Sequence, residues 1–448
     1  MKKEATYFML HFINVHLPLE DRSSLYEVII QEGKYESIKK QDDYREEDTF
    51  IPLKGEHVGK TRKIDCEGRV MLPGLVDMHM HLDKAYSFSS VPNESGTLEE
   101  AIHNYDKLTP TFTSEILRQR MIKASLEALS YGTTTIRTHI DFSFTLPEEV
   151  AFRGLETALE VKEELKEFMD IEVAPMFSGI DVNDESHFER MRKAIELGID
   201  AIGGAPHLAK EPEKEIELLF LMAKTYDKPL DLHTDESDDP DRDTVISIAE
   251  QTVKSDMKGR VVVDHLCSLA AMTEDKAHRV IELMKEADLG VVTLPAVNMY
   301  LQGRGDEGIV RRGTTRIREL KAEGIRVATA SDNIHDPFHP FGKADLIQIG
   351  LMTAYVAHMG TRGEQHDLLK MMTHVPASIL GLRQYGIKEG HPANFVIFNA
   401  QSVEGVFTDI PSTRYVFNRH RWVSVTETSK RLATHSMTEL WRANQFQI

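Results

Sequence analysis

The stretch LPGLVDMHMHLDKAY, residues 72–86, decides the fold of this chain. Its apolar residues Leu75 and Val76 lead into His79 and His81, and residues two apart point to the same side of a β-strand. The stretch therefore predicts a buried strand that ends in two imidazoles on one face. Those imidazoles either hold one ion together or are polar residues on one side of a loop.

Seven further segments along the chain resemble this one, because most of them begin apolar and end polar. The eight segments are residues 74–81, 134–141, 171–178, 199–207, 229–236, 260–266, 289–298 and 325–333. The stretches between them have helical periodicity, and this alternation is typical of a parallel sheet built from βα units. Eight such units predict an α/β fold, a (β/α)8 TIM barrel.

One of the intervening helices is predicted in detail from TSEILRQRMIKASLEALSYG, residues 113–132. Thr113 or Ser114 is its expected N-cap, and Gly132 ends it. The predicted apolar stripe consists of Ile116, Leu117, Met121, Leu126 and Leu129.

The two ends of the chain lack the alternation of strand-like and helical segments that the middle of the chain has. Residues 1–70 read as short strands and turns, beginning with YFMLHFINVHL, and the last sixty residues contain the strand-like ANFVIFNA and TRYVFNRHRWVSV. We expect them to form one small β-sandwich domain from residues 1–72 and 386–448. Residues 73–385 then form the barrel.

Composition excludes several classes of protein. The formal net charge of −19 argues against a nucleic-acid partner, since phosphate binding needs clustered Lys and Arg. The two cysteines, Cys66 and Cys267, cannot build a disulfide framework, which fits a reducing compartment. The N-terminal segment has no uninterrupted apolar core of a signal peptide, and no apolar run approaches the ~18 residues of a membrane span. We expect a cytoplasmic protein with no membrane partner.

The polar residues at the strand ends carry the chemistry. His79 and His81 end the first predicted strand, His233 the fifth, His265 the sixth and Asp332 the eighth. The carboxyl ends of barrel strands converge and carry the active site. Three neutral imidazoles and one carboxylate suit a divalent ion such as zinc or iron. Such an ion lowers the pKa of a bound water toward ~7.

Each of these residues has an ordinary alternative when it is taken alone. His265 could be a core histidine bonded to a carbonyl, and Asp332 could cap a turn. Glu236 lies in an acidic run that would normally begin a solvated helix, although it follows His233 by three residues, close enough for acid–base work. Their joint occurrence at the strand ends favours a site. The match GRGDEG to a nucleotide-binding pattern is interpreted as a loop, because it neither follows a strand closely nor opens a helix.

In these motifs the chain resembles the amidohydrolase superfamily, and within it the cytosine deaminase-like branch. The matching blocks are LPGLVDMHMHLDKAY, IRTHID (136–141), HTDESDD (233–239), the pair DH (264–265), VNMYLQGR with RRGTTRIRE (297–319), SDNIHDPFHPFG (331–342) and HPANFVIFNA (391–400). They occur in the family's order and cover essentially the whole chain.

The resemblance implies one divalent metal ion, zinc or iron, and assigns roles to residues. The implied ligands are His79, His81, His233 and Asp332. Glu236 shuttles protons, His265 orients the attacking water and steadies the oxyanion, and Asp332 takes the water proton. Small heterocyclic molecules are the implied substrates. Members of the branch often form homo-oligomers, and the oligomeric state stays open for this chain.

Two positions depart from the cytosine deaminase pattern. Phe177 stands where those enzymes carry a pyrimidine-reading Gln, and Asn333 stands where they carry a second Asp. Both departures argue against cytosine itself, since a site built for one polar edge rejects others. We expect substrate contacts from Phe177, Asn333, Lys84 and His207.

The resulting functional expectation is a metal-dependent hydrolytic deaminase that acts on a C–N bond of a nitrogen heterocycle. Hydrolysis of a cyclic amide, or removal of an alkylamino group from a triazine, is the alternative within the same superfamily. An inactive binding protein on this fold is the alternative from a different class.

Overall fold

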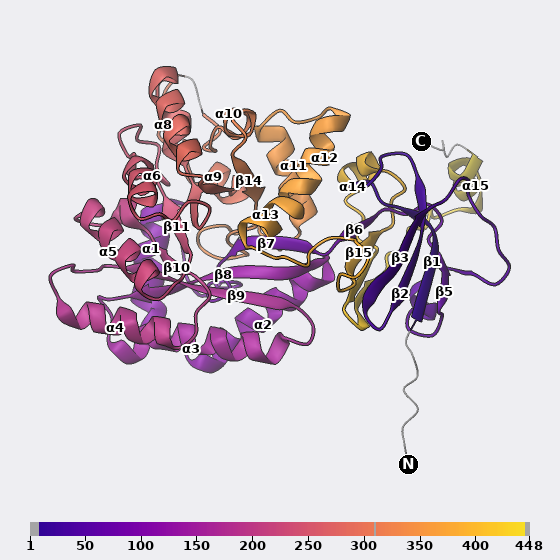
Figure 1. Cartoon of the computed structure of the whole chain (residues 1–448), viewed down its shortest axis with the longest axis horizontal. Coiled ribbons are helices and arrows are strands. Elements are labelled where there is room, and N and C mark those ends of the chain that lie inside the picture. Colours follow the sequence, from indigo (N-terminus) through magenta and orange to yellow (C-terminus); the bar gives the residue numbers. More distant parts are fainter. Residues whose placement is uncertain (1–8, 309–310, 444–448) are drawn as a thin grey trace, which may run out of the picture.

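The computed structural model describes residues 9–308 and 311–443. A barrel surrounded by helices occupies one end of the molecule, and a β-rich part lies beside it at the other end (Figure 1). The predicted first strand is described from Met9 onward, and Tyr7 and Phe8 lie outside the described residues. Among the described residues, the structure contains no helix whose length and hydropathy would let it cross a membrane.

The barrel is one sheet of eight strands in the order of the chain, from β7 to β14. Its strands are β7 (Leu75–Met80), β8 (Thr133–Ser143), β9 (Asp170–Ser178), β10 (Ile202–Gly204), β11 (Leu230–Thr234), β12 (Val261–His265), β13 (Gly290–Thr293) and β14 (Arg326–Thr329). Every neighbouring pair is parallel. The prediction of a TIM barrel is confirmed.

The barrel closes between its first and last strands, at a contact that we call the seam, residues 77–81 and 331–332. Met80 and Asp332 form an isolated parallel bridge, and the amide of Asp332 donates to the carbonyl of His79 at 2.8 Å. The amide of Ser331 donates to the Asp77 carboxylate at 3.1 Å. Three of the four expected metal ligands are therefore part of, or adjacent to, the backbone contacts that close the barrel.

Helices cover the outside of the barrel between successive strands (Figure 1). They are α1 (Leu98–Leu108), α2 (Ser114–Ser130), α3 (Glu148–Leu165), α4 (Glu185–Glu196), α5 (Pro212–Thr225), α6 (Thr244–Lys254), α7 (Cys267–Ala271), α8 (Glu274–Glu286), α9 (Pro295–Leu301), α10 (Ile317–Ala322), α11 (Leu346–Val356), α12 (Arg362–Met371) and α13 (His374–Ile379), with 3-10 turns at Thr109–Thr111 and at η3 (Pro206–Leu208).

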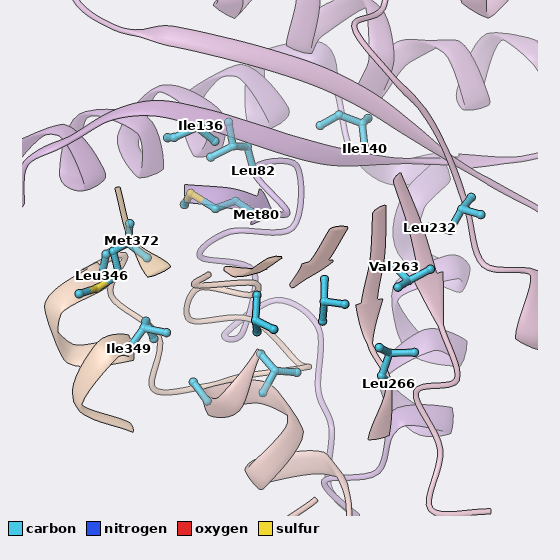
Figure 2. Packing of buried hydrophobic residues seen from close by; sticks show 14 of the residues in the cluster. Met80, Leu82, Ile136, Ile140, Leu232, Val263, Leu266, Leu346, Ile349 and Met372 are labelled. Atoms are coloured by element: carbon cyan, nitrogen blue, oxygen red, sulfur yellow. The ribbon is translucent and has the colours of Figure 1, made fainter. Parts of the chain in front are cut away.

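One large hydrophobic cluster joins these helices to the strands. Met80 and Leu82 belong to it, together with Ile136 of β8 and with Leu346 and Ile349 of α11 (Figure 2). His79 and His81, which alternate with Met80 and Leu82 in the sequence, are buried in a polar cluster instead. This alternation is why one short segment can serve both the core and a polar site.

Helix α2 confirms most of its sequence prediction. Thr113 is the N-cap, and its side chain accepts a hydrogen bond from the amide of Ile116. Leu117, Met121 and Leu129 are buried, whereas Ile116 and Leu126 are 38% and 45% exposed. The buried face of α2 is thus displaced from the predicted stripe, and it also includes Ala124 and Ala128.

The β-rich part contains two sheets. The first has the order β3-β2-β1-β5-β4 and the second the order β17-β16-β15-β6. The strands are β1 (Met9–His16), β2 (Leu25–Gln31), β3 (Lys34–Lys40), β4 (Ile51–Pro52), β5 (Lys63–Asp65), β6 (Met71–Pro73), β15 (Asn394–Phe398), β16 (Arg414–Asn418) and β17 (Arg421–Thr426), with helical turns or helices at Gly55–His57, α14 (Val403–Asp409) and α15 (His435–Ala443).

The pairing of β6 with β15 brings the N- and C-terminal segments together, with Leu72 opposite Val396. Aromatic rings of both segments share one core, in which Phe12 contacts Phe395 edge-on at 5.6 Å between centroids. The division of the chain at residues 72/73 and 385/386 stays a prediction, and β6 spans the first of these positions.

Two barrel segments differ from their predicted form. Strand β10 has three residues, and His207, predicted at a strand end, lies on η3. Strand β13 ends at Thr293, because Pro295 begins helix α9. Proline is favoured in the first turn of a helix and cannot donate to a sheet, so Asn298 lies on a helix rather than at a strand end.

Candidate active site

The side chains of His79, His81, His233 and Asp332 converge at the carboxyl end of the barrel. Nε2 of His81 lies 3.2 Å from Nε2 of His233 and 3.4 Å from Oδ1 of Asp332. Nε2 of His79 lies 3.6 Å from the same carboxylate oxygen. All four side chains are buried. His79 lies on β7 and His233 on β11, His81 directly follows β7, and Asp332 lies three residues after the end of β14.

This arrangement fits a single divalent ion. Zinc–nitrogen bonds of about 2.05 Å at tetrahedral angles put neighbouring ligand atoms roughly 3.3 Å apart, close to the distances seen here. Nε2 of His79 and both carboxylate oxygens of Asp332 are buried without a hydrogen-bond partner among the described residues. Buried polar atoms are normally paired, so these atoms are suited to coordination.

The protonation states also suit coordination. Burial lowers the pKa of His79 to about 3 and holds the pKa values of His81 and His233 well below the ordinary value of 6.5. All three imidazoles are therefore neutral at pH 7 and have a lone pair available.

A second layer of buried polar groups, which the sequence did not reveal, supports the ligands. Oδ2 of Asp264 lies 3.0 Å from Nδ1 of His79, on the side away from Asp332. The carbonyl oxygen of His139 lies 3.1 Å from Nδ1 of His81, and this contact fixes the orientation of the His81 ring. The only available sequence signal was the polar ends of the strands at 139–141 and 264–265.

Glu236 and His265 lie beside the ligand cluster. Nδ1 of His265 is 3.5 Å from Oε1 of Glu236, and Nε2 of His265 is 3.9 Å from Oδ2 of Asp332. Burial raises the pKa of Glu236 to about 8. Its carboxyl group therefore keeps its proton at neutral pH.

Asn298, on α9, fixes the tautomer of His265. The amide nitrogen of Asn298 donates to Nδ1 of His265 at 2.9 Å. An amide nitrogen can only donate, so the ring proton of neutral His265 lies on Nε2. That nitrogen has no hydrogen-bond partner among the described residues, and it is directed toward the Asp332 side of the site.

These groups line one cavity of about 250 Å³, which we call the active-site cavity. His81, His233, Glu236, His265 and Asp332 form its polar end. Lys84, His207 and Asn333, which we predicted as substrate contacts, also line it. The remaining wall is largely apolar and includes Leu98, Ile102, Val150, Val297, Leu301 and Phe338. A mostly apolar cavity with a few convergent polar groups is typical of a small-molecule site.

Phe177 does not line this cavity. It is fully buried and packs edge-on against Phe142 at 5.3 Å between ring centroids. Its neighbours Met176 and Ser178 line the cavity instead, because consecutive residues of β9 point to opposite faces. The predicted substrate contact at Phe177 is thus wrong by one residue, since the residues on either side of it face the cavity.

Lys84 lies on the wall of the cavity in a charged cluster. Its Nζ is 2.5 Å from Oδ1 of Asp141 and 3.0 Å from Nδ1 of His81. Burial lowers the pKa of Lys84, but the carboxylates of Asp141 and Asp83 raise it more, so that the net shift is upward. An ammonium beside a carboxylate thus offers a donor and an acceptor next to each other.

Comparisons with known proteins agree with this geometry. The chain is 30% identical over 363 residues to a pterin deaminase of Rhizobium rhizogenes, covering 80% of this chain and 81% of the relative. It is 28% identical over 372 residues to an N-isopropylammelide isopropyl amidohydrolase of Pseudomonas sp., covering 81% and 88% of the two chains.

A solved structure shares the architecture over nearly the full length. The 5-methylcytosine deaminase of Klebsiella pneumoniae, liganded with 5-fluorocytosine, superimposes with a TM-score of 0.85 at 27% identity, covering 94% of this chain and 99% of that one. The sequence profile of the Amidohydrolase family matches residues 95–417. The chain therefore belongs to the amidohydrolase family.

Proposed function

We propose that this protein is a metal-dependent hydrolase that removes an amino group from a ring carbon of a nitrogen heterocycle. The observation that carries this proposal is that His79 lies close both to His81 and Asp332 and to His233 and His265. His81, His233, Asp332, His265 and Glu236 line the end of one cavity. Two relatives support the substrate class, since one is a pterin deaminase and the other a 5-methylcytosine deaminase.

We infer that the four ligand residues hold one zinc or iron ion. Neutral imidazoles with one carboxylate are a ligand set that both ions accept. Bound there, the ion supplies a nucleophilic water at neutral pH.

Asp332 and His265 act on the oxygen side of the reaction. An oxygen of the Asp332 carboxylate accepts the proton of the attacking water as its oxygen bonds to the ring carbon. Nε2–H of His265 then donates a hydrogen bond to that oxygen as negative charge develops on it. This role requires the ring proton of His265 on Nε2. The hydrogen bond that the amide of Asn298 donates to Nδ1 favours that tautomer.

Glu236 acts on the nitrogen side. Its carboxyl, protonated at neutral pH, donates its proton to the adjacent ring nitrogen during the addition. The Glu236 carboxylate then takes the remaining proton of the added hydroxyl and passes it to the exocyclic amine, and the proton held by Asp332 restores the Glu236 carboxyl. The C–N bond breaks, and ammonia leaves while the ring keeps the new oxygen.

The remaining polar groups of the cavity recognise the ring. The pair Lys84 and Asp141 presents a donor and an acceptor, which matches a carbonyl next to an N–H on a heterocycle. Asn333 is held by Asp336, which accepts from its amide at 2.7 Å. His207 also lines the cavity, and its buried Nε2 has no hydrogen-bond partner among the described residues.

Removal of an alkylamine is the second candidate reaction. The N-isopropylammelide relative favours it, and the apolar wall of the cavity can accept an alkyl group. The two reactions need the same residues and differ only in the amine that leaves. An inactive binding protein, the third reading of the sequence, would release neither product.

The test is product release from a panel of pterin, 5-methylcytosine, cytosine and N-isopropylammelide, with the metal content measured on the same protein. We expect ammonia from at least one ring and about one ion per chain. Glu236→Gln should lower kcat by about 10²–10⁴-fold at unchanged metal content, because the proton donor is lost while the ligands remain. The exposed Glu250→Gln on α6 is the control variant and should behave as the wild type. Retained turnover in Glu236→Gln contradicts the proposed role.

A further inference from the structure

A second cavity adjoins the active-site cavity and is not needed by the proposed chemistry. It encloses about 420 Å³ between the loop that follows β9 and the loop that follows β10. Five residues line both cavities, and they are Thr145, Ser178, Gly179, Ala205 and Leu208. The shared residues place the two cavities side by side, with the second cavity on the side of the first that is away from the ligand cluster.

Glu215 of α5 lines this second cavity and is only 3% exposed. Its carboxyl group makes no hydrogen bond or ion pair with any other described residue. Two other acids of the cavity differ from it, because Glu211 pairs with Lys214 at 2.5 Å and Asp181 accepts from the amide of Asn183 at 3.0 Å. A buried carboxyl without a partner is unfavourable, and a ligand that donates to it removes that penalty.

The electrostatics of the second cavity restrict the ligand further. Asp181, Glu211 and Glu215 line it, and Lys210 is the cationic side chain among its lining residues. Carboxylate or phosphate groups are therefore disfavoured there by like charge. A neutral or cationic hydrogen-bond donor is favoured.

We propose that the second cavity is a subsite for a side chain on the substrate heterocycle, and that a hydroxyl or amino group of this side chain donates to Glu215. The proposal rests on the proposed function and narrows its substrate class to rings with a short polar, non-acidic substituent. The ring occupies the active-site cavity, and the substituent passes the shared wall of Thr145, Gly179 and Leu208.

The experiment compares three pterins on the metal-loaded protein: pterin without a side chain, biopterin with a dihydroxypropyl chain, and 6-carboxypterin. We expect the KM of biopterin to be about tenfold below that of pterin, and that of 6-carboxypterin to be above it, since a buried carboxyl that is left without a partner costs about that factor or more. Where another ring of the panel is the one turned over, its hydroxyalkyl and carboxyalkyl derivatives replace the pterins.

Variants at position 215 connect this preference to the carboxyl group. In Glu215→Leu the ratio of the two KM values should fall from about ten to about one, and Glu215→Gln, which preserves the shape, should fall between. Glu213→Gln, exposed on the same helix, should keep the wild-type ratio. Should the Leu variant fail to fold, the Gln variant carries the comparison.

The outcomes separate the two proposals. Equal KM values for pterin and biopterin in the wild type, or an unchanged ratio in the Glu215 variants, overturn the subsite while the proposed function stands. Absence of ammonia and alkylamine release from every ring overturns the proposed function and the subsite with it.

Discussion

Asn298 controls the position of a single proton, the ring proton of His265. It contacts neither the ligand residues nor, in the proposed mechanism, the substrate, but its donated hydrogen bond decides which nitrogen of His265 carries the proton. It is therefore a positioning residue, and its effect can be separated from packing by changing only its hydrogen-bonding character.

Asn298→Asp exchanges the donor for an acceptor of nearly the same shape. The carboxylate should pull the His265 proton to Nδ1, so that Nε2 can no longer donate to the developing oxyanion, and kcat should fall by about 10²–10³-fold. Asn298→Ala removes the donor without reversing it and should have a smaller effect. Steady-state kinetics with measured metal content check this order. Equal losses in both variants mean that Asn298 only packs.

The sequence predicts the convergence of the proposed ligand residues better than it predicts the contacts around them. His79, His233 and Asp332 each lie at or next to the end of a predicted strand, and the barrel topology alone brings such positions together. The contact from Asn298 could not be predicted, because it depends on a helix that begins at Pro295. Phe177 was misplaced because a strand period of two turns an error of one residue into the opposite face.

At the scale of elements, helix α5 begins at the mouth of the barrel and presents Glu215 to the second cavity. Burial raises the pKa of this carboxyl from its ordinary value of 4.5 to about 7. Between these two values the folded protein holds a proton that the unfolded chain has released. The free energy of unfolding therefore falls as the pH rises from about 4.5 to about 7, and it stays lower above that range.

Glu215→Gln should remove this pH dependence. We expect the variant to gain about 1–3 kcal/mol relative to the wild type on going from pH 5 to pH 8, because the amide has no charge to desolvate. Denaturant unfolding of both proteins at the two pH values measures the difference. Glu213→Gln is the matched control and should show no such gain. If the free energies of unfolding of the wild type and of Glu215→Gln differ by the same amount at both pH values, burial of the Glu215 carboxyl is not the cause of the pH dependence.

Element boundaries were predictable where local signals were strong. Thr113 caps α2 as expected, since a threonine oxygen at this position satisfies a free amide. The large apolar residues alone misplaced the buried face of that helix, because Ile116 and Leu126 lie on its exposed side while the small residues Ala124 and Ala128 are buried. Strand β10 was predicted too long, since apolar residues next to a short strand look the same in sequence whether they pair or not.

At the scale of the whole molecule, the proposed metal site and the closure of the barrel occupy the same place. Strands β7 and β14 meet at the seam through the bridge between Met80 and Asp332, and His79 and Asp332 contribute both backbone hydrogen bonds and ligand atoms. His233, from β11, would connect the opposite side of the barrel to the seam through the proposed ion. Coordination should thus stabilise the first and last strands against each other, in a way that the sheet of β15, β16 and β17, which holds none of the proposed ligands, does not share.

Removal of the ion by a chelator should therefore loosen the molecule unevenly. Binding to the folded state at 1,000 times the dissociation constant stabilises by about 4 kcal/mol, and this stabilisation is lost with the ion. Hydrogen–deuterium exchange should show faster exchange for the amides of His81 and Asp332, both of which donate across the seam. Amides of Val396 and Val416, paired in the sheet of β15, β16 and β17, are the internal control and should keep their protection. Re-addition of zinc should restore the seam. A uniform loss of protection across both regions, or none at the seam, contradicts the view that the ligands help to close the barrel.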